Sequence, residues 1–318
     1  MRDTLTAAPA RTQLPLRHLT GPHALDRALI EHLLERAAGF EQAPESGAGR
    51  LQGRLLATIF YEPSTRTRFS FESAMHRLGG QVLSAENATR DSSAAKGESL
   101  EDAIRVISGY ADGIVLRHSE LGAAERAAQA ADVPVISAGD GPGHHPTQAL
   151  LYLFTIKKEV GRLDHLRVGL AGDLRNGRTV RSLALLLSRF SGNQLVLISP
   201  PGLKMRDDVI DSLTQARQGI EETGDFVGAI PGLDVLYQTR VQAERFSSPQ
   251  EYERYRGVYV VTADVLRRLA EHAILMHPLP RVGEIEPVVD ADPRAAYFRQ
   301  ARNGLWVRMA VLDWAMAR

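Results

Sequence analysis

The sequence predicts an α/β protein with two doubly wound parallel-sheet domains joined by helices. Three observations carry this prediction. Short apolar runs alternate with segments of helical periodicity along most of the chain, a pattern typical of βαβ units. The segment 146–161 begins with Pro and ends with Gly, which is the usual polarity of a helix, and a second strand–helix series follows it. At 318 residues, the chain is also long enough for two cores.

The elements follow in order along the chain. Buried strands are predicted at 55–61, 113–116, 134–137, 167–171, 194–199, 235–237 and 273–276. Helices are predicted at 100–110, 123–131, 146–161, 179–190 and 264–271. We therefore expect a first domain at 1–147, a second domain at 162–297, and a C-terminal helix at 303–318 that returns to the first domain.

Composition narrows the function classes. Lys and Arg total 38, and so do Asp and Glu, so no global basic field favours nucleic acid as a partner. There is no cysteine, which excludes disulfides, thiol nucleophiles and cysteine zinc sites and fits a cytoplasmic protein. No apolar run reaches the length of a signal peptide or a membrane span, so we expect no membrane association and a partly ordered N-terminal leader.

Six polar loops follow predicted strands at equivalent ends. Parallel α/β sheets bind ligands outside the carboxyl ends of their strands, where such loops meet. The loops are 64–68, 117–118, 139–148, 172–179, 240–242 and 277–280. Their shared position predicts a binding site at the edges of the two sheets.

The loop STRTR, 64–68, lies directly before an amphipathic helix that buries Phe71, Ala74, Met75 and Leu78 and ends at Gly79. A plain N-cap requires only one Ser or Thr. Three hydroxyls and a guanidinium at the positive end of a helix suit a phosphate instead. The pattern therefore favours a phosphate cradle over a simple helix cap.

Two further motifs have competing interpretations. GDLRNGRT, 172–179, has the spacing of a nucleotide-triphosphatase phosphate loop, but Arg178 stands where that loop requires Lys, which argues against it. His144 and His145 lack the spacing and the cysteines of a metal site. His145 is either a solvated turn residue or, with nearby Gln148, a hydrogen-bond donor to a carbonyl oxygen.

Several of these motifs together resemble one family. STRTR, HPTQ at 145–148 and HPLP at 277–280 are similar to the carbamoyltransferases. GDLRNGRTVRSL, LYQTRVQAER and MHPLPRVGEI resemble the aspartate carbamoyltransferases within the aspartate/ornithine carbamoyltransferase family. The resemblance runs from about Leu16 to the C-terminus. It implies transfer of the carbamoyl group of carbamoyl phosphate to the amino group of L-aspartate, a step of pyrimidine biosynthesis, without metal or organic cofactor.

The resemblance also implies residue roles. Carbamoyl phosphate would be bound by Ser64, Thr65, Arg66, Thr67, Arg117, His145 and Gln148, together with the backbone carbonyls of Leu279 and Pro280 from the second domain. Of these, Arg66, Thr67, Arg117 and His145 would be catalytic, because they surround the phosphate and the carbonyl oxygen where negative charge develops. The second domain would bind the two carboxylates of aspartate through Arg178, Arg240 and Gln242.

A polar loop, 91–103, completes the implied site. In the family this loop reaches a neighbouring subunit, so Ser92 and Lys96 would contact that subunit's ligands, Lys96 as part of the aspartate site. The implied catalytic unit is a homotrimer. The resemblance is also compatible with a larger assembly of this trimer with regulatory chains or a dihydroorotase.

The chain departs from the family pattern at two places. Arg175 and Asn176 replace a Lys–Tyr pair, and 246–252, FSSPQEY, is one residue longer, which leaves the alignment of Glu251 open. Two alternatives remain: an ornithine carbamoyltransferase, which would have Cys at Pro278, and a non-catalytic scaffold chain, which would have lost the phosphate arginines or His145.

Overall fold

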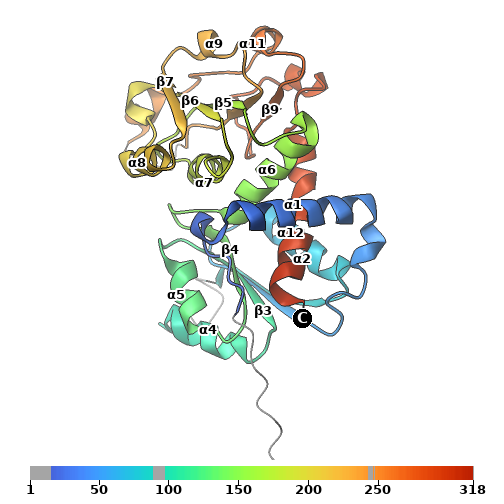
Figure 1. The fold of residues 1–318 in the computed structure, drawn as a ribbon. Helices are drawn as coiled ribbons and strands as arrows, with labels where there is room; N and C mark the ends of the chain where they lie inside the picture. Colours follow the sequence, from blue (N-terminus) through green and yellow to red (C-terminus); the bar gives the residue numbers. More distant parts are fainter. Residues whose placement is uncertain (1–15, 89–96, 243–245, 247, 318) are drawn as a thin grey trace, which may run out of the picture.

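The computed structural model describes residues 16–88, 97–242, 246 and 248–317. It contains two separate sheets, of four and five strands, and every strand pair in both is parallel. Helices cover the faces of each sheet, and the two sheets stack one above the other in Figure 1. The predicted fold class, two parallel-sheet α/β domains, is confirmed.

The first sheet comes from the first half of the chain. Its strands are β1 (Leu55–Phe60), β2 (Gln81–Glu86), β3 (Gly113–His118) and β4 (Val135–Asp140), in the order β2-β1-β3-β4. Its helices are α1 (Arg27–Gln42), α2 (Thr65–Arg77), α4 (Leu100–Ser108) and α5 (Ala123–Ala130). Two short 3-10 turns, η1 (Pro22–Ala24) and η2 (Pro44–Gly47), flank α1.

The second sheet contains β5 (Arg167–Ala171), β6 (Gln194–Ile198), β7 (Gly219–Thr223), β8 (Val235–Gln238) and β9 (Ile274–Met276), in the order β7-β6-β5-β8-β9. Its helices are α7 (Arg178–Leu187), α8 (Asp207–Gln215), α9 (Phe226–Ala229), α10 (Pro249–Glu253) and α11 (Ala263–Arg268). The 3-10 turns η4 (Pro201–Leu203) and η6 (Pro287–Ala291) complete it.

Two helices connect the domains. α6 (Pro146–Val160) leads from the first sheet to the second, and α12 (Tyr297–Met316) runs back to pack on α1, α2 and α6 (Figure 1). α12 begins at Tyr297, earlier than the expected 303. It continues through Asn303 and Gly304, which are poor helix formers. Tertiary contacts compensate: Asn303 donates to the buried Thr155 hydroxyl, and Gly304 lies where a Cβ would meet Arg308 and Leu151.

The strands are apolar because both sheet faces are covered. β1, LLATIF, is buried at five of its six positions. Leu56 and Phe60 join a core that runs on through α6 into the second domain, whereas Ala57 and Ile59 pack on the opposite face with α4 and α5. This burial on both sides produces near-continuous apolar runs, which is why the central strands could be recognised in the sequence.

The prediction lacked several elements, among them the strands β2 and β7 and the helix α1. β2 and β7 are edge strands with polar, largely exposed sequences, QVLSAE and GIEET, so they lack the apolar run of a central strand. Their stability comes from parallel pairing with β1 and β6 along one side only. α1 starts behind Asp26, whose carboxylate accepts from the Leu29 N–H, and it packs along α12.

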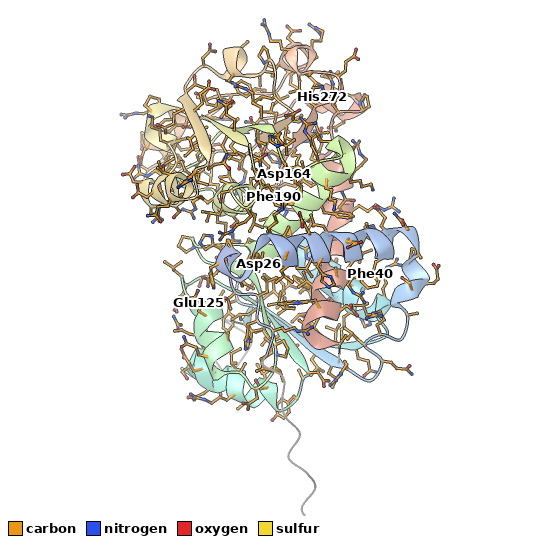
Figure 2. The ribbon with its side chains drawn as sticks, viewed as in Figure 1. Asp26, Phe40, Glu125, Asp164, Phe190 and His272 are labelled. Atoms are coloured by element: carbon orange, nitrogen blue, oxygen red, sulfur yellow. The ribbon has the colours of Figure 1, made fainter. Side chains whose placement is uncertain are left out.

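The domains also meet at the surface beside α1. Arg27 on α1 donates to Asp164 of the second domain at 2.9 Å, and its guanidinium lies 5.0 Å from the centre of the Phe190 ring (Figure 2). Within the described ranges, no helix combines the length and the apolar character that crossing a bilayer requires.

Candidate active site

A cavity of about 970 Å³ lies between the two domains, at the carboxyl ends of the strands. All six polar loops identified in the sequence contribute to its wall or adjoin it. Of the expected site residues, Ser64, Thr65, Arg66, Thr67, Arg117, His145, Gln148, Arg178, Arg240, Gln242, Leu279 and Pro280 line it. Ser92 and Lys96 lie outside the described residues. The topology therefore brings together side chains that are up to 216 residues apart in the chain, from Ser64 to Pro280.

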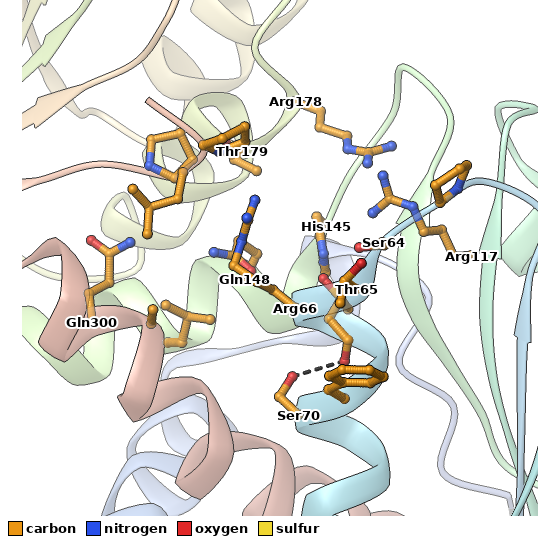
Figure 3. A pocket seen from close by; sticks show the side chains of 18 of the residues that line it. Ser64, Thr65, Arg66, Ser70, Arg117, His145, Gln148, Arg178, Thr179 and Gln300 are labelled. Carbon is orange, nitrogen blue, oxygen red and sulfur yellow. Dashed lines mark hydrogen bonds between the residues drawn. The ribbon is translucent and has the colours of Figure 1, made fainter. Parts of the chain in front are cut away.

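The N-terminus of α2 forms one wall. Ser64 occupies the N-cap position, but its side chain makes no capping hydrogen bond. The first N–H groups of a helix have no partner within the helix, so they and the Ser64 hydroxyl remain available to a ligand. Figure 3 shows Ser64, Thr65 and Arg66 at this end of α2, facing the open space. The arrangement is that of an anion-binding helix end.

The two arginines of the STRTR motif point in different directions. Arg66 lines the cavity. Arg68 turns toward β2, where it pairs with Glu86 at 2.9 Å, and it also lies 3.5 Å from Glu72 on its own helix. Only one of the two guanidiniums therefore belongs to the candidate phosphate cradle, and the other ties α2 to the edge strand.

Arg117 and Arg178 approach each other from different domains. Glu62 lies between them, 3.3 Å from a nitrogen of Arg117 and 3.6 Å from one of Arg178. Burial first, and then the positive charge of Arg178, lower the pKa of Arg117 to about 10, although Glu62 acts in the opposite direction. Since one carboxylate faces two guanidiniums, with Arg66 nearby as a third cation, this part of the wall favours an anionic ligand.

Gly139 makes the approach of the two arginines possible. Its φ is +124°, and a Cβ at this position would lie 3.1 Å from Arg117 Nη1 and 3.2 Å from Arg178 Nη2. A larger residue would be strained in its backbone and would also press on both guanidiniums.

His145 is almost fully buried, with 3% of its surface exposed. Burial lowers its pKa well below the ordinary 6.5, and the charges of Arg178, Arg117 and Arg308 act in the same direction. The ring is therefore neutral at physiological pH and carries a single N–H. A neutral imidazole can donate a hydrogen bond to a developing oxyanion without competing for the phosphate as a cation.

The loop that leads to His145 is held by the second domain. Arg178 donates to the Gly141 carbonyl at 2.7 Å, and Arg181 donates to the Pro142 carbonyl. The Ser182 hydroxyl accepts from the backbone N–H of His145 at 3.2 Å. Three residues on one face of α7 thus fix this loop across the domain interface.

The second-domain loops are tied to each other through Asp173. Its carboxylate accepts from the Asn176 backbone at 3.0 Å and from the Gln242 backbone at 3.5 Å. Burial raises the pKa of Asp173, and these hydrogen bonds partly offset the effect. Asn176, one of the departures from the family pattern, therefore stabilises the loop that carries Arg178.

The 277–280 segment is organised by His277. Its Nδ1 accepts from the Leu279 N–H at 2.9 Å, and its Nε2 lies 2.7 Å from a carboxylate oxygen of Glu284. Burial lowers the pKa of His277. Burial alone would raise the pKa of Glu284, but the hydrogen bond and charge of His277 lower it overall. The loop is thereby held with Leu279 and Pro280 at the cavity wall.

Sequence reasoning did not identify Glu62, Thr179 or Arg308, which also line the cavity. Glu62 lies two residues before the STRTR motif, and Thr179 is the last residue of the GDLRNGRT motif, so proximity to those motifs was a usable signal. Arg308 lies within the apolar α12, where no local pattern distinguishes it from a surface charge. Among the described residues, no three His, Asp or Glu side chains gather as metal ligands.

The fold and the cavity define a class: a two-domain α/β enzyme that holds anionic substrates between its domains. The chain belongs to the aspartate/ornithine carbamoyltransferase family. The family's carbamoyl-P binding domain matches residues 17–158, and its Asp/Orn binding domain matches residues 164–315.

Relatives and solved structures agree with this assignment. Aspartate carbamoyltransferase 1, chloroplastic, of Pisum sativum is 56% identical over 290 residues, which cover 90% of this chain and 75% of the relative. The catalytic subunit of M. jannaschii aspartate transcarbamoylase superposes with a TM-score of 0.87 at 45% identity, covering 94% of this chain and 97% of that one. The Trypanosoma cruzi enzyme in complex with carbamoyl phosphate and aspartate gives a TM-score of 0.87 at 38% identity, covering 95% and 96%.

Proposed function

We propose that this chain is an aspartate carbamoyltransferase, which converts carbamoyl phosphate and L-aspartate into N-carbamoyl-L-aspartate and phosphate, a step of pyrimidine biosynthesis. One observation carries the proposal: a single cavity joins a hydroxyl-rich helix end and Arg66 on one side to Arg178 and Arg240 on the other. The first side suits a phosphate, and the second side suits the two carboxylates of aspartate.

The reaction follows from these positions. The amino nitrogen of aspartate forms a bond to the carbonyl carbon of carbamoyl phosphate, and the bond from that carbon to the phosphate oxygen breaks. The amine loses a proton, which the departing phosphate can accept. Negative charge grows on the carbonyl oxygen, and donors from Thr67, Arg117 and the neutral His145 stabilise it more in the transition state than in the ground state.

The remaining residues would orient the donor substrate. Gln148 and the backbone carbonyls of Leu279 and Pro280 offer hydrogen-bond acceptors, which the carbamoyl NH₂ requires. Arg66 and Arg117 would neutralise the phosphate as it leaves. No step needs a metal, because carbamoyl phosphate is already an activated acyl donor.

A direct assay tests the proposal. Purified protein is incubated with carbamoyl phosphate and either L-aspartate or L-ornithine, and the carbamoylated products are measured. We expect carbamoyl aspartate and no citrulline, since the two arginines of the second domain match a dicarboxylate and would repel a cationic side chain. Citrulline formation, or no product from either amine, would overturn the assignment.

We also propose that the working unit is a homotrimer in the cytoplasm, with Ser92 and Lys96 serving the neighbouring subunit. The family resemblance and the lack of cysteine support this. Larger assemblies with regulatory chains or a dihydroorotase are compatible with it. Light scattering on the purified protein measures the subunit number, and fractionation of the native cells measures the location.

Mixed subunits test the shared site. Arg66→Ala chains and Lys96→Ala chains are each expected to be nearly inactive. When the two are unfolded together and reassembled, some interfaces combine an intact cradle with an intact loop, so activity should reappear. A mixture no more active than its parents means that each chain builds its own site.

A further inference from the structure

A chain of buried polar groups runs behind the cavity and links its two sides. Gln148 Nε2 donates to the Tyr152 hydroxyl at 3.0 Å, and the Tyr237 hydroxyl donates to the same oxygen at 3.2 Å. The Tyr237 oxygen is also 2.9 Å from the Thr179 hydroxyl. Gln148 and Thr179 line the cavity, on α6 and α7 (Figure 3), whereas both tyrosines are fully buried.

Arg308 determines how the Gln148 amide is turned. The Arg308 guanidinium lies 3.4 Å from the Gln148 amide and carries only N–H donors, so the atom that faces it must be the carbonyl oxygen. The amide nitrogen then faces Tyr152, whose oxygen accepts from it. One orientation satisfies both neighbours, and it leaves the second lone pair of Oε1 available to a ligand in the cavity.

Tyr152 is suited to hold this orientation. Burial raises the pKa of Tyr152 to about 12, so the side chain stays a neutral hydroxyl at physiological pH. Its ring packs edge-on against Tyr237 with centres 5.1 Å apart, an apolar contact that a phenylalanine would keep. Loss of the hydroxyl alone would therefore leave the packing in place and deprive the amide nitrogen of its buried partner.

We propose that Tyr152, supported by Tyr237 and Thr179 of the second domain, is a positioning residue that turns the Gln148 oxygen toward the NH₂ group of carbamoyl phosphate. Tyr152 touches no substrate and acts through Gln148. The inference rests on the proposed function, because it assigns the Gln148 oxygen to the carbamoyl group. Under this proposal, buried residues of the second domain contribute to the recognition of carbamoyl phosphate, the first substrate.

The test compares two ligands of the same cradle. Carbamoyl phosphate and inorganic phosphate share the phosphate group, but only the first has an NH₂ to recognise. Tyr152→Phe should weaken carbamoyl phosphate binding, and raise its KM, by about 3- to 10-fold, the effect of one lost hydrogen bond. Its inhibition constant for inorganic phosphate and its kcat should stay near those of the unmodified protein.

A double variant tests whether Tyr152 acts through Gln148. In a Gln148→Ala background, adding Tyr152→Phe should change carbamoyl phosphate binding no further, because the amide that it orients is gone. Thr155→Val is the matched control, since it removes another buried hydroxyl of α6, one that bonds Leu151 and Asn303. It should lower stability while leaving the ratio of the two ligand affinities unchanged.

Three outcomes would overturn the inference: equal weakening of both ligands, no change in either, or a persistent effect of Tyr152→Phe in the Gln148→Ala background. Each outcome counts against the inference only when the unmodified protein, assayed in parallel, forms carbamoyl aspartate. If the unmodified protein forms none, the proposed function fails instead, so the two failures are distinguishable.

Discussion

The two halves of the cavity are built in different ways. The half beside the first sheet comes from α2, β3 and the start of α6, and most of its contacts lie within one domain; Arg117, for example, donates to the Ala138 carbonyl at 3.2 Å. The half beside the second sheet depends on contacts across the interface, such as the bond from Arg178 to the Gly141 carbonyl. The helix end of α2 and Arg117 are therefore formed within the first domain, whereas the loop before α6 and the second half are coupled to the domain arrangement.

This difference has a consequence for binding. A phosphate group at the helix end of α2 needs no particular placement of the second domain, whereas a ligand that spans both halves needs Arg117, Arg178 and Glu62 to be close together. Changes in the phosphate cradle should thus affect both substrates, and a change at Arg240 should affect aspartate alone.

The largest expected effect is that of Arg66→Ala, because it removes a charge from the cradle on which both substrates depend. Arg66 is exposed in the free protein and would be covered by the bound phosphate, so we expect a loss of about 2–5 kcal/mol in kcat/KM, the range for removing one partner of a charge pair that is buried in the complex. Arg68→Ala is the matched control: its guanidinium pairs with Glu72 and Glu86 outside the cavity, so kcat/KM should change little. Steady-state kinetics of both variants measure these changes in kcat/KM. Near-normal turnover of Arg66→Ala would show that Arg66 is not part of the phosphate cradle.

Arg240→Ala should confine its effect to the second substrate. Loss of one bidentate carboxylate contact should raise the KM for aspartate by about 1.5–3 kcal/mol in free-energy terms. Carbamoyl phosphate binding alone, measured by calorimetry, should stay unchanged. If that binding is lost as well, the two halves are not separable in this way.

Gly139→Ala tests the point where the halves meet. The substitution combines a strained positive φ with a Cβ close to both Arg117 and Arg178, so we expect a loss of about 1–3 kcal/mol in unfolding free energy. The KM values for both substrates should rise. Urea unfolding and kinetics measure the two effects, and an increase for aspartate alone would place Gly139 in the second half.

The smallest expected effect is a pH dependence from His145. Its pKa in the folded protein lies well below the 6.5 of an unfolded chain, so the unfolded state binds more protons as the pH falls below about 6.5. Stability should therefore decrease with falling pH, by at most about 1.4 kcal/mol per pH unit for one proton. His145→Gln should make this decrease shallower. Urea midpoints from pH 7 to 5 test it, and identical slopes would contradict a buried neutral ring.

The sequence by itself determined the parts that follow local or periodic rules. Central strands such as β5 appeared at their observed bounds, because burial on both faces requires a continuous apolar run. The STRTR motif was visible because it has more hydroxyls and arginines than a helix cap requires, and HPLP was visible through the family resemblance. The edge strands β2 and β7 could not be predicted in this way, because one-sided pairing permits polar residues.

Only the tertiary structure decided which side chains share a space. Arg66 and Arg68 look alike in sequence. Arg66 lines the cavity and Arg68 contacts the edge strand β2, and this difference depends on where β2 lies relative to α2. Arg308 lies in an apolar stretch of α12 without a motif, and although Tyr152 and Tyr237 adjoin recognised polar segments, no local pattern shows that their hydroxyls meet. Tyr152 lies one helical turn from Gln148, but Arg308 reaches Gln148 only because α12 returns to the first domain, and Tyr237 reaches Tyr152 only because β8 faces α6. Such contacts between distant segments leave no local pattern in the chain.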